Sequence, residues 1–401
     1  MVIRQHRKCG HPHPQALPEA RRVLILALPC RKGVVADVDR AEWEEKEGRL
    51  RALMDRHNLD AVLLSRSANV AWLSGGGRSF VNIASDGGVG SLLVTPEARY
   101  LLTDVIEAER LRVEEGFGEG GWEIVAEPWH RRRSRLAELT EGLRVGTDVA
   151  GTQFADLGGE IARLRWLLTL AEVERFRSLG ADAGAAIGEA AASVRPGMSE
   201  YDIAGLLADA TYRRGAVPIV TLVAVDERMS QRRHPLPTNK IVERAAMLVL
   251  CARRHGLVAS VTRLAHFGPV PGDLKDKMRA VATVDAAAVR ATQPGVAANA
   301  VFRVIQQAYA DVGYPDEWKN HHQGGPAGYE PRDYVATPNT EQLVEAVQAF
   351  AWNPSVPGAK SEDTFLVTGS GQELLTPSPG WPQQQVEAAG QVMSRPDVLQ
   401  L

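Results

Sequence analysis

The sequence is poor in the features that mark secreted and membrane proteins. Its 401 residues include only three cysteines, Cys9, Cys30 and Cys251. This argues against a disulfide framework and favours a reducing, cytoplasmic setting. No apolar run approaches the roughly 20 residues that a membrane-spanning helix needs, and the net charge is only −3. We therefore expect neither a membrane nor a nucleic acid as a partner.

The chain also lacks a nucleotide-binding motif. Its glycine-rich segments 75–78 and 87–90 have neither the spacing nor the Lys-Ser/Thr ending of a phosphate-binding loop. We interpret both as loops, with Arg78 at a loop tip either solvated or part of a binding site. What is present is typical of a globular protein: 44% of the residues are hydrophobic, and the length suffices for two cores.

The first 35 residues differ from the rest in charge. They carry seven Lys and Arg residues against the single acid Glu19, together with the short apolar run Val23–Leu28. A signal peptide is a weaker interpretation, because the run is short and lacks a good cleavage pattern. We expect residues 1–35 to be a disordered or non-native basic tail.

The remaining sequence predicts two domains. Residues 36–160 alternate helical and β-like segments, as in a small α/β domain. Residues 161–401 begin with a capping box at Thr169 and Glu172, and a second cap follows at Ser199. The segments that we expect in the first domain are a helix over 41–57, strands over 60–65, 69–74, 90–95 and 99–103, and a helix over 105–115. Those in the second are helices over 169–194, 199–214, 273–291 and 297–311 and a strand over 217–224.

One stretch concentrates groups that can do chemistry. His321 and His322 precede a glycine-rich turn, and Tyr329 and Arg332 follow within twelve residues. A histidine in such a loop can be a metal ligand, a general base or a buried polar residue. Tyr329 can equally pack in the core or donate a proton. Cys251 follows an apolar strand, which favours a buried thiol over a nucleophile.

Seven sequence blocks stand in an order that is typical of one enzyme superfamily. They are Asn69–Gly75, Leu168–Arg177, Val194–Glu200, Arg233–Thr238, Val261–Arg263, Asn353-Pro354 and Ser361–Thr368. Together they resemble the creatinase/aminopeptidase P/prolidase superfamily, the pita-bread peptidases, over roughly residues 40–385. The resemblance implies a creatinase-like N-terminal α/β domain, a C-terminal pita-bread α+β domain and a homodimer.

The resemblance implies a pair of divalent ions held by two Asp, one His and two Glu. Carried over in turn, these positions fall on or beside Cys251, then on Ser260, His322, Asn353 and Glu362. Only His322 and Glu362 keep the family's residue type. Neutral side chains do not supply the negative charge that two divalent ions require. We therefore expect no dinuclear metal cofactor and at most a single, weakly held ion.

Creatinase, in the same superfamily, works without metal through a histidine and carboxylates. The corresponding histidine falls on His234, with Glu362 as a nearby carboxylate. Basic residues also crowd the matched blocks and favour a substrate carboxylate. The predicted catalytic residues are His234, Glu362, His322 and Tyr329; the predicted substrate-binding residues are Arg78, Arg232, Arg253, Arg332 and Asn353.

Three functions follow from these residues. The first is a metal-independent, creatinase-like hydrolase of a C–N bond in a small anionic substrate or short peptide. The second is an Xaa-Pro dipeptidase or aminopeptidase with a rebuilt metal site. The third is a catalytically inactive pseudo-peptidase with a binding role. If the family's dimer is kept, Arg78 is expected to reach the partner's cleft.

Overall fold

The computed structural model describes residues 40–131 and 134–401. The basic tail predicted for residues 1–35 lies outside these ranges, and the domain limits expected at residues 35 and 160 stay predictions. No helix in the two described ranges combines enough length with enough apolar character to cross a membrane.

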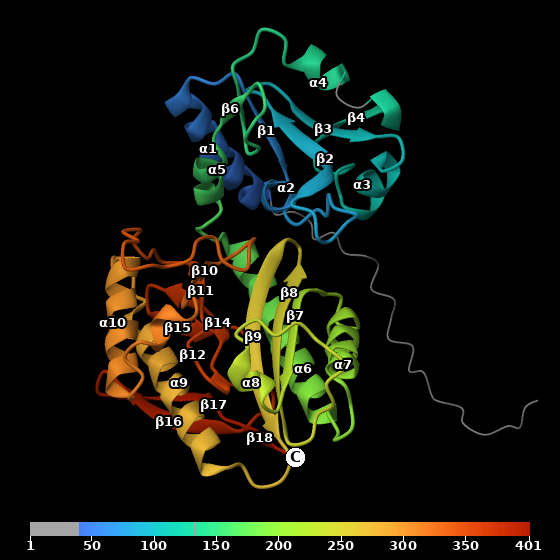
Figure 1. Cartoon of the computed structure of the whole chain (residues 1–401). Helices are drawn as coiled ribbons and strands as arrows, with labels where there is room; N and C mark the ends of the chain where they lie inside the picture. Colours follow the sequence, from blue (N-terminus) through green and yellow to red (C-terminus); the bar gives the residue numbers. More distant parts are fainter. Residues whose placement is uncertain (1–39, 132–133) are drawn as a thin grey trace, which may run out of the picture. The chain divides into compact units, whose positions relative to one another are not determined.

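A six-stranded mixed sheet organises the N-terminal α/β domain (Figure 1). Its central strand β1 (Ala61–Arg66) pairs antiparallel with β2 (Gly87–Val94) and parallel with β5 (Val145–Thr147). The first four residues of β1 are buried, which explains its unbroken apolar run. The other elements are α1 (Arg40–His57), α2 (Ser67–Leu73), β3 (Arg99–Asp104), α3 (Ala108–Glu114), β4 (Glu123–Glu127), η1 (Trp129–Arg131), α4 (Ser134–Leu139), β6 (Ala155–Asp156) and α5 (Gly158–Leu164).

The strand predicted over residues 69–74 is wrong, because this segment belongs to helix α2. A short apolar run does not distinguish a buried strand from a buried helical segment. Here tertiary contacts decide. The Asn69 side-chain amide donates to Asp148 Oδ2 at 2.8 Å, and Ser74 Oγ donates to the carbonyl of Val70 at 2.7 Å. These bonds hold the helical turn against the sheet.

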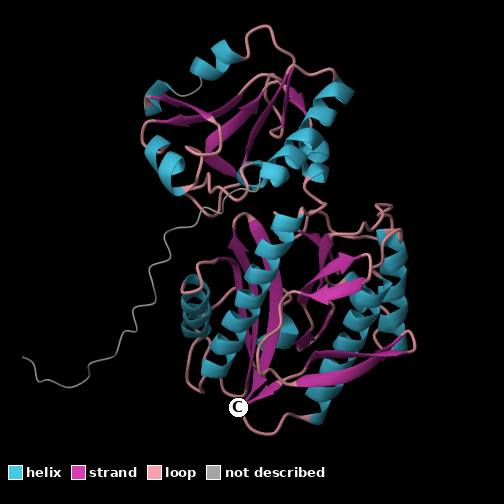
Figure 2. Cartoon of the chain, turned by 180° about the vertical axis from the view of Figure 1, so that it is seen from behind, coloured by secondary structure: helices cyan, strands magenta, loops and turns pink. Residues whose placement is uncertain are grey.

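Two four-stranded sheets form the framework of the C-terminal domain, with strand orders β18-β9-β8-β7 and β10-β11-β14-β15. Helices α6 and α7 pack on the first sheet, and α9 packs beside the second and against α10 (Figures 1 and 2). The strands are β7 (Val217–Val225), β8 (Ala245–Arg254), β9 (Leu257–His266), β10 (Gly324–Ala327), β11 (Gln348–Trp352), β12 (Ser355–Val356), β13 (Ala359–Lys360), β14 (Asp363–Thr368), β15 (Gly371–Leu374), β16 (Gln383–Ala388), β17 (Gln391–Pro396) and β18 (Leu399–Gln400). The helices are α6 (Leu170–Ser193), α7 (Glu200–Tyr212), α8 (Arg228–Gln231), α9 (Gly272–Ala291), α10 (Ala298–Asp311) and η2 (Glu317–Lys319).

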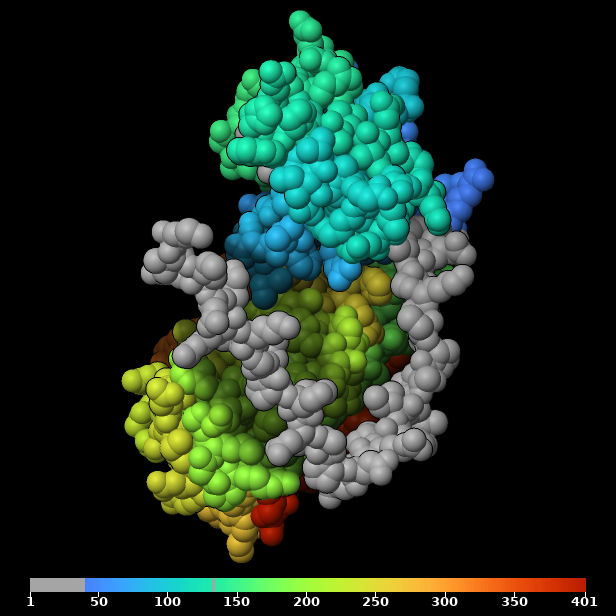
Figure 3. All heavy atoms as spheres, turned by 90° about the vertical axis from the view of Figure 1, so that its right-hand side faces the viewer, coloured from blue at the N-terminus to red at the C-terminus, as the bar shows by residue number. Residues whose placement is uncertain are grey.

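Both predicted capping boxes are confirmed. Thr169 and Glu172 cap α6, and Ser199 and Asp202 cap α7. Each side chain accepts from a backbone N–H that the first helical turn leaves unpaired, so the sequence fixes where both helices begin. In Figure 3 the green and yellow-green atoms include those of α6 and α7, the two helices that pack on the first sheet.

Two glycines let α6 approach the chain that follows β15. A Cβ atom added at Gly180 would lie 2.2 Å from the carbonyl oxygen of Leu375, and one at Gly184 would lie 2.2 Å from that of Pro377. Only glycine permits this approach of backbone to backbone. The contact holds residues 375–377 beside β14 and thereby supports the segment that carries Glu362.

A buried ionic cluster connects α1 with α6. Lys46 is fully buried, and its ammonium lies 2.6 Å from Glu42 Oε1 and 2.7 Å from Glu172 Oε1. It also donates to the carbonyl of Trp72 at 2.7 Å. The Tyr329 hydroxyl donates to the same oxygen of Glu172 at 2.5 Å. Because every member has a charged or polar partner, the cluster tolerates burial.

Candidate active site

The candidate site lies where β9 meets the beginning of β14. Backbone contacts align the two strands: the Thr262 amide donates to the carbonyl of Glu362 at 3.1 Å, and Thr364 Oγ1 accepts from the Ser260 amide at 2.8 Å. Glu362 is the residue immediately before β14, so its carboxylate is held at this junction.

The carboxylate of Glu362 is buried and receives two cations. Arg332 Nη2 donates to Oε1 at 2.8 Å, Lys360 Nζ lies 2.9 Å from Oε2, and Thr262 Oγ1 donates to Oε2 at 2.7 Å. Burial by itself would raise the pKa of Glu362, but the charges of Lys360 and Arg332 outweigh it and lower the pKa to about 2. Glu362 is therefore a permanent anion at neutral pH.

Cys251 and Ser260 lie opposite each other on β8 and β9, and their Sγ and Oγ atoms are 3.3 Å apart. Both are buried. Burial, assisted by the charge of Glu362, raises the pKa of the Cys251 thiol, which makes it a weak nucleophile. Arg332 Nη1 donates to Ser260 Oγ at 3.1 Å. A guanidinium thus bridges Ser260 and Glu362.

Two buried polar atoms close to these groups have no hydrogen-bond partner within the described residues. They are Nε of Arg332 and Oδ1 of Asn353. The first is a donor and the second an acceptor, and unpaired groups of this kind are costly in a protein interior. A bound ligand that offers one acceptor and one donor would satisfy both.

Three histidines gather beside the carboxylate. The Nε2 atoms of His234 and His321 are 3.0 Å apart, and His322 stacks on His321 with ring centroids 4.5 Å apart. One nitrogen from each ring lies within 4.8 Å of the others. Desolvation lowers the pKa of all three rings, to about 2 for His321 and about 4 for His322. The cluster is therefore uncharged at neutral pH.

The metal pair implied by the resemblance does not fit these residues. Of its five ligand positions, Cys251, Ser260 and Asn353 carry neutral side chains, and the carboxylate oxygens of Glu362 are engaged by Arg332 and Lys360. A pair of divalent ions held side by side needs anionic donors that offset its charge. Here two fixed side-chain cations already neutralise the one carboxylate.

A cavity of ≈ 220 Å³ adjoins the strands of the site. Arg253 lines it, stacked over the Phe80 ring at 4.2 Å, and its Nε and Nη2 have no partner within the described part of the chain. Val220, another lining residue, pairs with Cys251 in register. Further lining residues are Ala68, Ala71, Arg78, Ile83, Asp86, Ile219, Tyr329, Glu330 and Pro331.

Other residues predicted for the site have different surroundings. Tyr329 is buried and lines the cavity, but its hydroxyl donates to Glu172 of the ionic cluster. Arg78 pairs with Glu115, its Nε donating at 2.9 Å. Arg232 is exposed and donates to the carbonyl of Gln231. The structure therefore does not bring the Arg232 guanidinium to Glu362.

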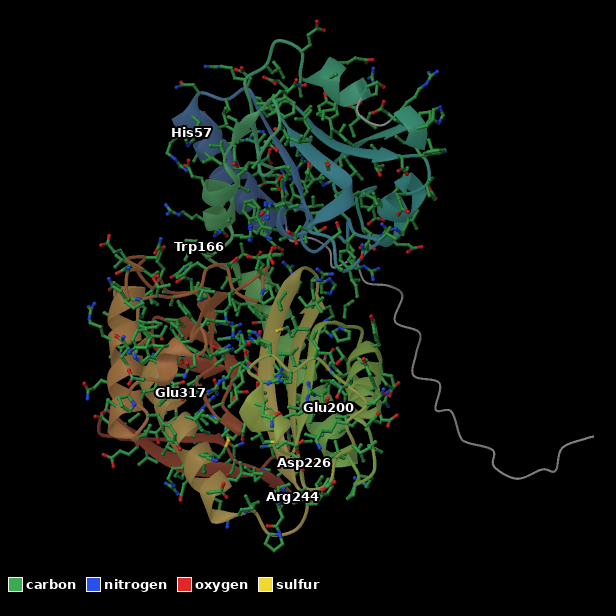
Figure 4. The ribbon with its side chains drawn as sticks, viewed as in Figure 1. His57, Trp166, Glu200, Asp226, Arg244 and Glu317 are labelled. Atoms are coloured by element: carbon green, nitrogen blue, oxygen red, sulfur yellow. The ribbon has the colours of Figure 1, made fainter. Side chains whose placement is uncertain are left out.

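Several of the clustered basic residues have structural ion pairs. Arg263 pairs with Asp363 at 2.9 Å, and Arg254 pairs with Asp182 at 2.6 Å. Arg233 pairs with Glu317, which is labelled in Figure 4. Of the basic side chains near the matched blocks, Arg332 contacts Glu362, and Arg253 faces the cavity with unpaired donors.

Lys360 was missed among the predicted site residues. It lies two residues before Glu362, and alternate residues of an extended chain share a face. The spacing of a Lys and a Glu at i and i+2 was therefore a usable signal. Thr262, inside a matched block, carried no charge that would have singled it out.

Comparison with known families matches both halves of the chain. Residues 48–167 match the family described as the creatinase/prolidase N-terminal domain. Residues 174–369 match the family described as metallopeptidase family M24. The second match includes β7, β8 and β9 of one sheet and β10, β11 and β14 of the other.

Individual relatives have low sequence identity to this chain, but the matches cover most of both chains. A curated relative, the Xaa-Pro dipeptidase of Pyrococcus horikoshii, is 23% identical over 351 residues, which are 83% of this chain and 97% of the relative. The solved prolidase from Pyrococcus horikoshii superposes with a TM-score of 0.72 at 21% identity, covering 83% of this chain and 98% of its own. The Xaa-Pro dipeptidase from Bacillus anthracis also gives 0.72, at 20% identity, covering 90% of this chain and 100% of its own. The predicted fold is thereby confirmed.

Proposed function

Since this chain belongs to the creatinase/prolidase superfamily and carries an M24-type hydrolase domain, we propose that it hydrolyses a C–N bond in a small, carboxylate-bearing substrate of the dipeptide kind. We propose further that it does so without the family's metal pair. The named relatives favour a peptide substrate, because the Pyrococcus horikoshii and Bacillus anthracis proteins are Xaa-Pro dipeptidases.

The observation that carries the proposal is the pairing of Glu362 with Arg332 and Lys360, at 2.8 and 2.9 Å. Two positively charged side chains flank one buried carboxylate, and electrostatic interactions are strong where water is scarce. Fixed cations of this kind can stabilise the negative charge that develops on a carbonyl oxygen during hydrolysis. They supply part of what a metal ion supplies as a Lewis acid.

The unpaired atoms of the site complement a dipeptide. A dipeptide offers a carbonyl oxygen, which accepts, and an N–H, which donates; in an Xaa-Pro dipeptide, whose peptide nitrogen carries no hydrogen, the N–H comes from the free α-amino group. Arg332 Nε is an unpaired donor and Asn353 Oδ1 an unpaired acceptor within the described residues. A dipeptide bound between them would satisfy both and would place its carbonyl beside the guanidinium.

Proton transfer falls to a histidine in this proposal. Glu362, with its pKa lowered to about 2, is too weak a base at neutral pH. His234 is exposed to solvent and its pKa is lowered by desolvation, so its neutral ring can accept a proton from an attacking water. The resulting imidazolium can return the proton to the leaving nitrogen.

Arg253 is the proposed anchor for the substrate carboxylate. It offers two unpaired N–H donors to a cavity that is also lined by apolar groups such as Ile83 and Ile219. A guanidinium binds a carboxylate through two parallel hydrogen bonds. The cavity suits a ligand with a compact apolar part and one carboxylate.

The test is hydrolysis of a dipeptide panel, Xaa-Pro dipeptides included, by enzyme treated with a chelator and then freed of it. Activity is expected to persist. His234→Ala is expected to lower kcat by roughly 10²–10⁴-fold, the usual contribution of a general base. Glu362→Gln is also expected to lower kcat, because it removes the charge that holds Arg332 and Lys360 in place. Arg232→Ala, at an exposed side chain near the same segment, is the matched control and should leave kcat unchanged. No cleavage of any panel member, or equal activity in His234→Ala, would contradict the proposal.

A metal-dependent Xaa-Pro dipeptidase is the second candidate. It is favoured by the likeness to dipeptidases over 83% of the chain and by the three clustered histidines. Under this alternative, the chelator would abolish activity and a divalent ion would restore it. The same experiment therefore separates the two candidates.

A further inference from the structure

His234, His321 and His322 form a cluster of nitrogen donors that the superfamily resemblance does not assign. The resemblance gives only His322 a metal-binding role, together with carboxylates. In the structure, one nitrogen from each ring lies within 4.8 Å of the other two, and two Nε2 atoms are 3.0 Å apart. Donor atoms around one tetrahedral ion, each about 2.0–2.1 Å from it, lie a little over ~3 Å from each other.

A hydrogen bond between two rings does not satisfy this cluster. If His321 Nε2 donates to His234, then His321 Nδ1 is a lone pair; if Nε2 accepts, then Nδ1 carries the hydrogen. In either tautomer the Nδ1 atom is buried and has no partner within the described residues. An ion bound at Nδ1 would satisfy this atom directly, whereas an ion bound at Nε2 would replace the hydrogen bond between the two rings and fix Nδ1 as the N–H.

The cluster has the composition of a mononuclear site. Three imidazoles with a water as fourth ligand are a common catalytic zinc arrangement, and imidazole also suits Cu, Ni and Co. The three residues lie in loops outside the regular elements, so the rings can adjust by the small distance that a shared ion requires. Neutral nitrogens favour these borderline ions over Mg²⁺ or Ca²⁺, which require oxygen.

We propose that His234, His321 and His322 bind one borderline divalent cation, of the Zn²⁺ and Co²⁺ class. This site shares His322 with the family's metal pair but has a different ligand set, because Glu362 is held by Arg332 and Lys360 and does not take part. A bound ion would use the lone pair of His234. If the function proposed above holds, the ion and the proton compete for that ring, and the ion inhibits hydrolysis.

Titration with Co²⁺ tests the site directly, because tetrahedral Co²⁺ has visible absorption bands. The sequence contains other metal donors at His6, Cys9, His11 and His13. The titration therefore uses a full-length variant in which these four residues are replaced by Ala. One Co²⁺ per chain is expected, displaced by Zn²⁺. His321→Ala and His322→Ala should each weaken binding by at least about tenfold, since even outer-shell changes cost 10–100-fold.

His57→Ala is the matched control. His57, labelled in Figure 4, pairs with Glu160 at 2.9 Å on another part of the chain, so its replacement should leave the titration unchanged. His321→Gln, which keeps a polar side chain of similar reach, guards against a variant that fails to fold. No saturable Co²⁺ binding, or binding that survives in the His321 and His322 variants, overturns the inference.

Hydrolysis measured during the same titration separates this inference from the proposed function. Loss of activity in step with the cobalt spectrum supports both. Saturable binding with unchanged or increased activity leaves the metal site standing and overturns the general-base role of His234. Absent binding in an active enzyme overturns the metal site alone.

Discussion

Cys251 Sγ and Ser260 Oγ lie 3.3 Å apart across β8 and β9. The superfamily resemblance places one aspartate on or beside Cys251 and another on Ser260. A thiol and a hydroxyl replace two carboxylates, and the Arg332 guanidinium donates to the hydroxyl at 3.1 Å. Where the resemblance implies acidic side chains that attract cations, this chain has a resident guanidinium, which favours anionic ligands.

The buried thiol should be chemically inert. Burial, with the nearby charge of Glu362, raises the pKa of Cys251, so little thiolate forms near neutral pH. In a variant with Ser at positions 9 and 30, iodoacetamide at pH 8 should leave Cys251 unmodified in the folded protein and label it in urea, as seen by mass spectrometry. Rapid labelling of the folded protein would instead indicate an accessible thiolate and revive a nucleophilic role.

Removal of Lys46 should destabilise the protein strongly. Lys46 is the fully buried partner of Glu42 and Glu172, and loss of one member of a buried pair costs roughly 3–5 kcal/mol. Lys46→Met should show this loss in urea unfolding. Arg51→Met is the control, because Arg51 pairs with Glu47 on the surface of the same helix and should cost less than about 1 kcal/mol. Equal costs would show that the cluster is not stabilising.

Gly180 should tolerate no side chain. A Cβ atom there would lie 2.2 Å from the Leu375 carbonyl oxygen, and such overpacking costs about 1–3 kcal/mol. Gly180→Ala should therefore lower the free energy of unfolding. Gly205, within α7, has no atom within 4 Å of the same added carbon, and Gly205→Ala should stabilise by up to about 1 kcal/mol. A stable Gly180→Ala variant would contradict the close packing of α6.

Stability should fall in mildly acidic solution through His255. Desolvation, then neighbouring positive charge, lowers its pKa in the folded protein to about 4. Below the unfolded value near ~6.5, the unfolded chain binds a proton that the folded protein does not, so the stabilisation present above that pH is lost as the pH falls towards 4. The charged groups that act on His255 are Arg175, Arg254, Arg78 and Glu115.

His255→Asn isolates this effect. Asparagine accepts the positive φ of 51° at this position and does not titrate. The wild type should lose at most about 1.4 kcal/mol per pH unit more than the variant between pH 6.5 and 4, measured as the free energy of unfolding at each pH. Parallel curves would assign the acid sensitivity to other groups.

Local sequence signals predicted much of the fold. The capping boxes at Thr169 and Ser199 predicted where α6 and α7 begin, because caps act within four residues. The segment 69–74 was misread, since the bond from Asn69 to Asp148 spans 79 residues and leaves no local pattern. Strand and helix are then distinguished by contacts that the sequence order does not display.

The site was predicted in its residue types more than in its contacts. A matched block pointed to Glu362, and the stretch that begins at His321 pointed to Arg332; the structure brings these two together. The sequence alone did not distinguish Arg232 from Arg253. In the structure, Arg232 is exposed and Arg253 lines a cavity. Tyr329 was ambiguous because its partner Glu172 is 157 residues away. Charge composition indicates an anion-binding site but not which guanidinium is unpaired.

Glu172 both caps helix α6 and takes part in the buried ionic cluster. Its Oε2 accepts from the Thr169 amide at the first turn of α6, while its Oε1 accepts from Lys46 of α1 and from Tyr329. If α1 or α6 unfolded alone, it would leave Glu172 or Lys46 as a buried charge without its partner. Heating should produce one calorimetric peak, whose van't Hoff and calorimetric enthalpies agree, where separate lobes would give two.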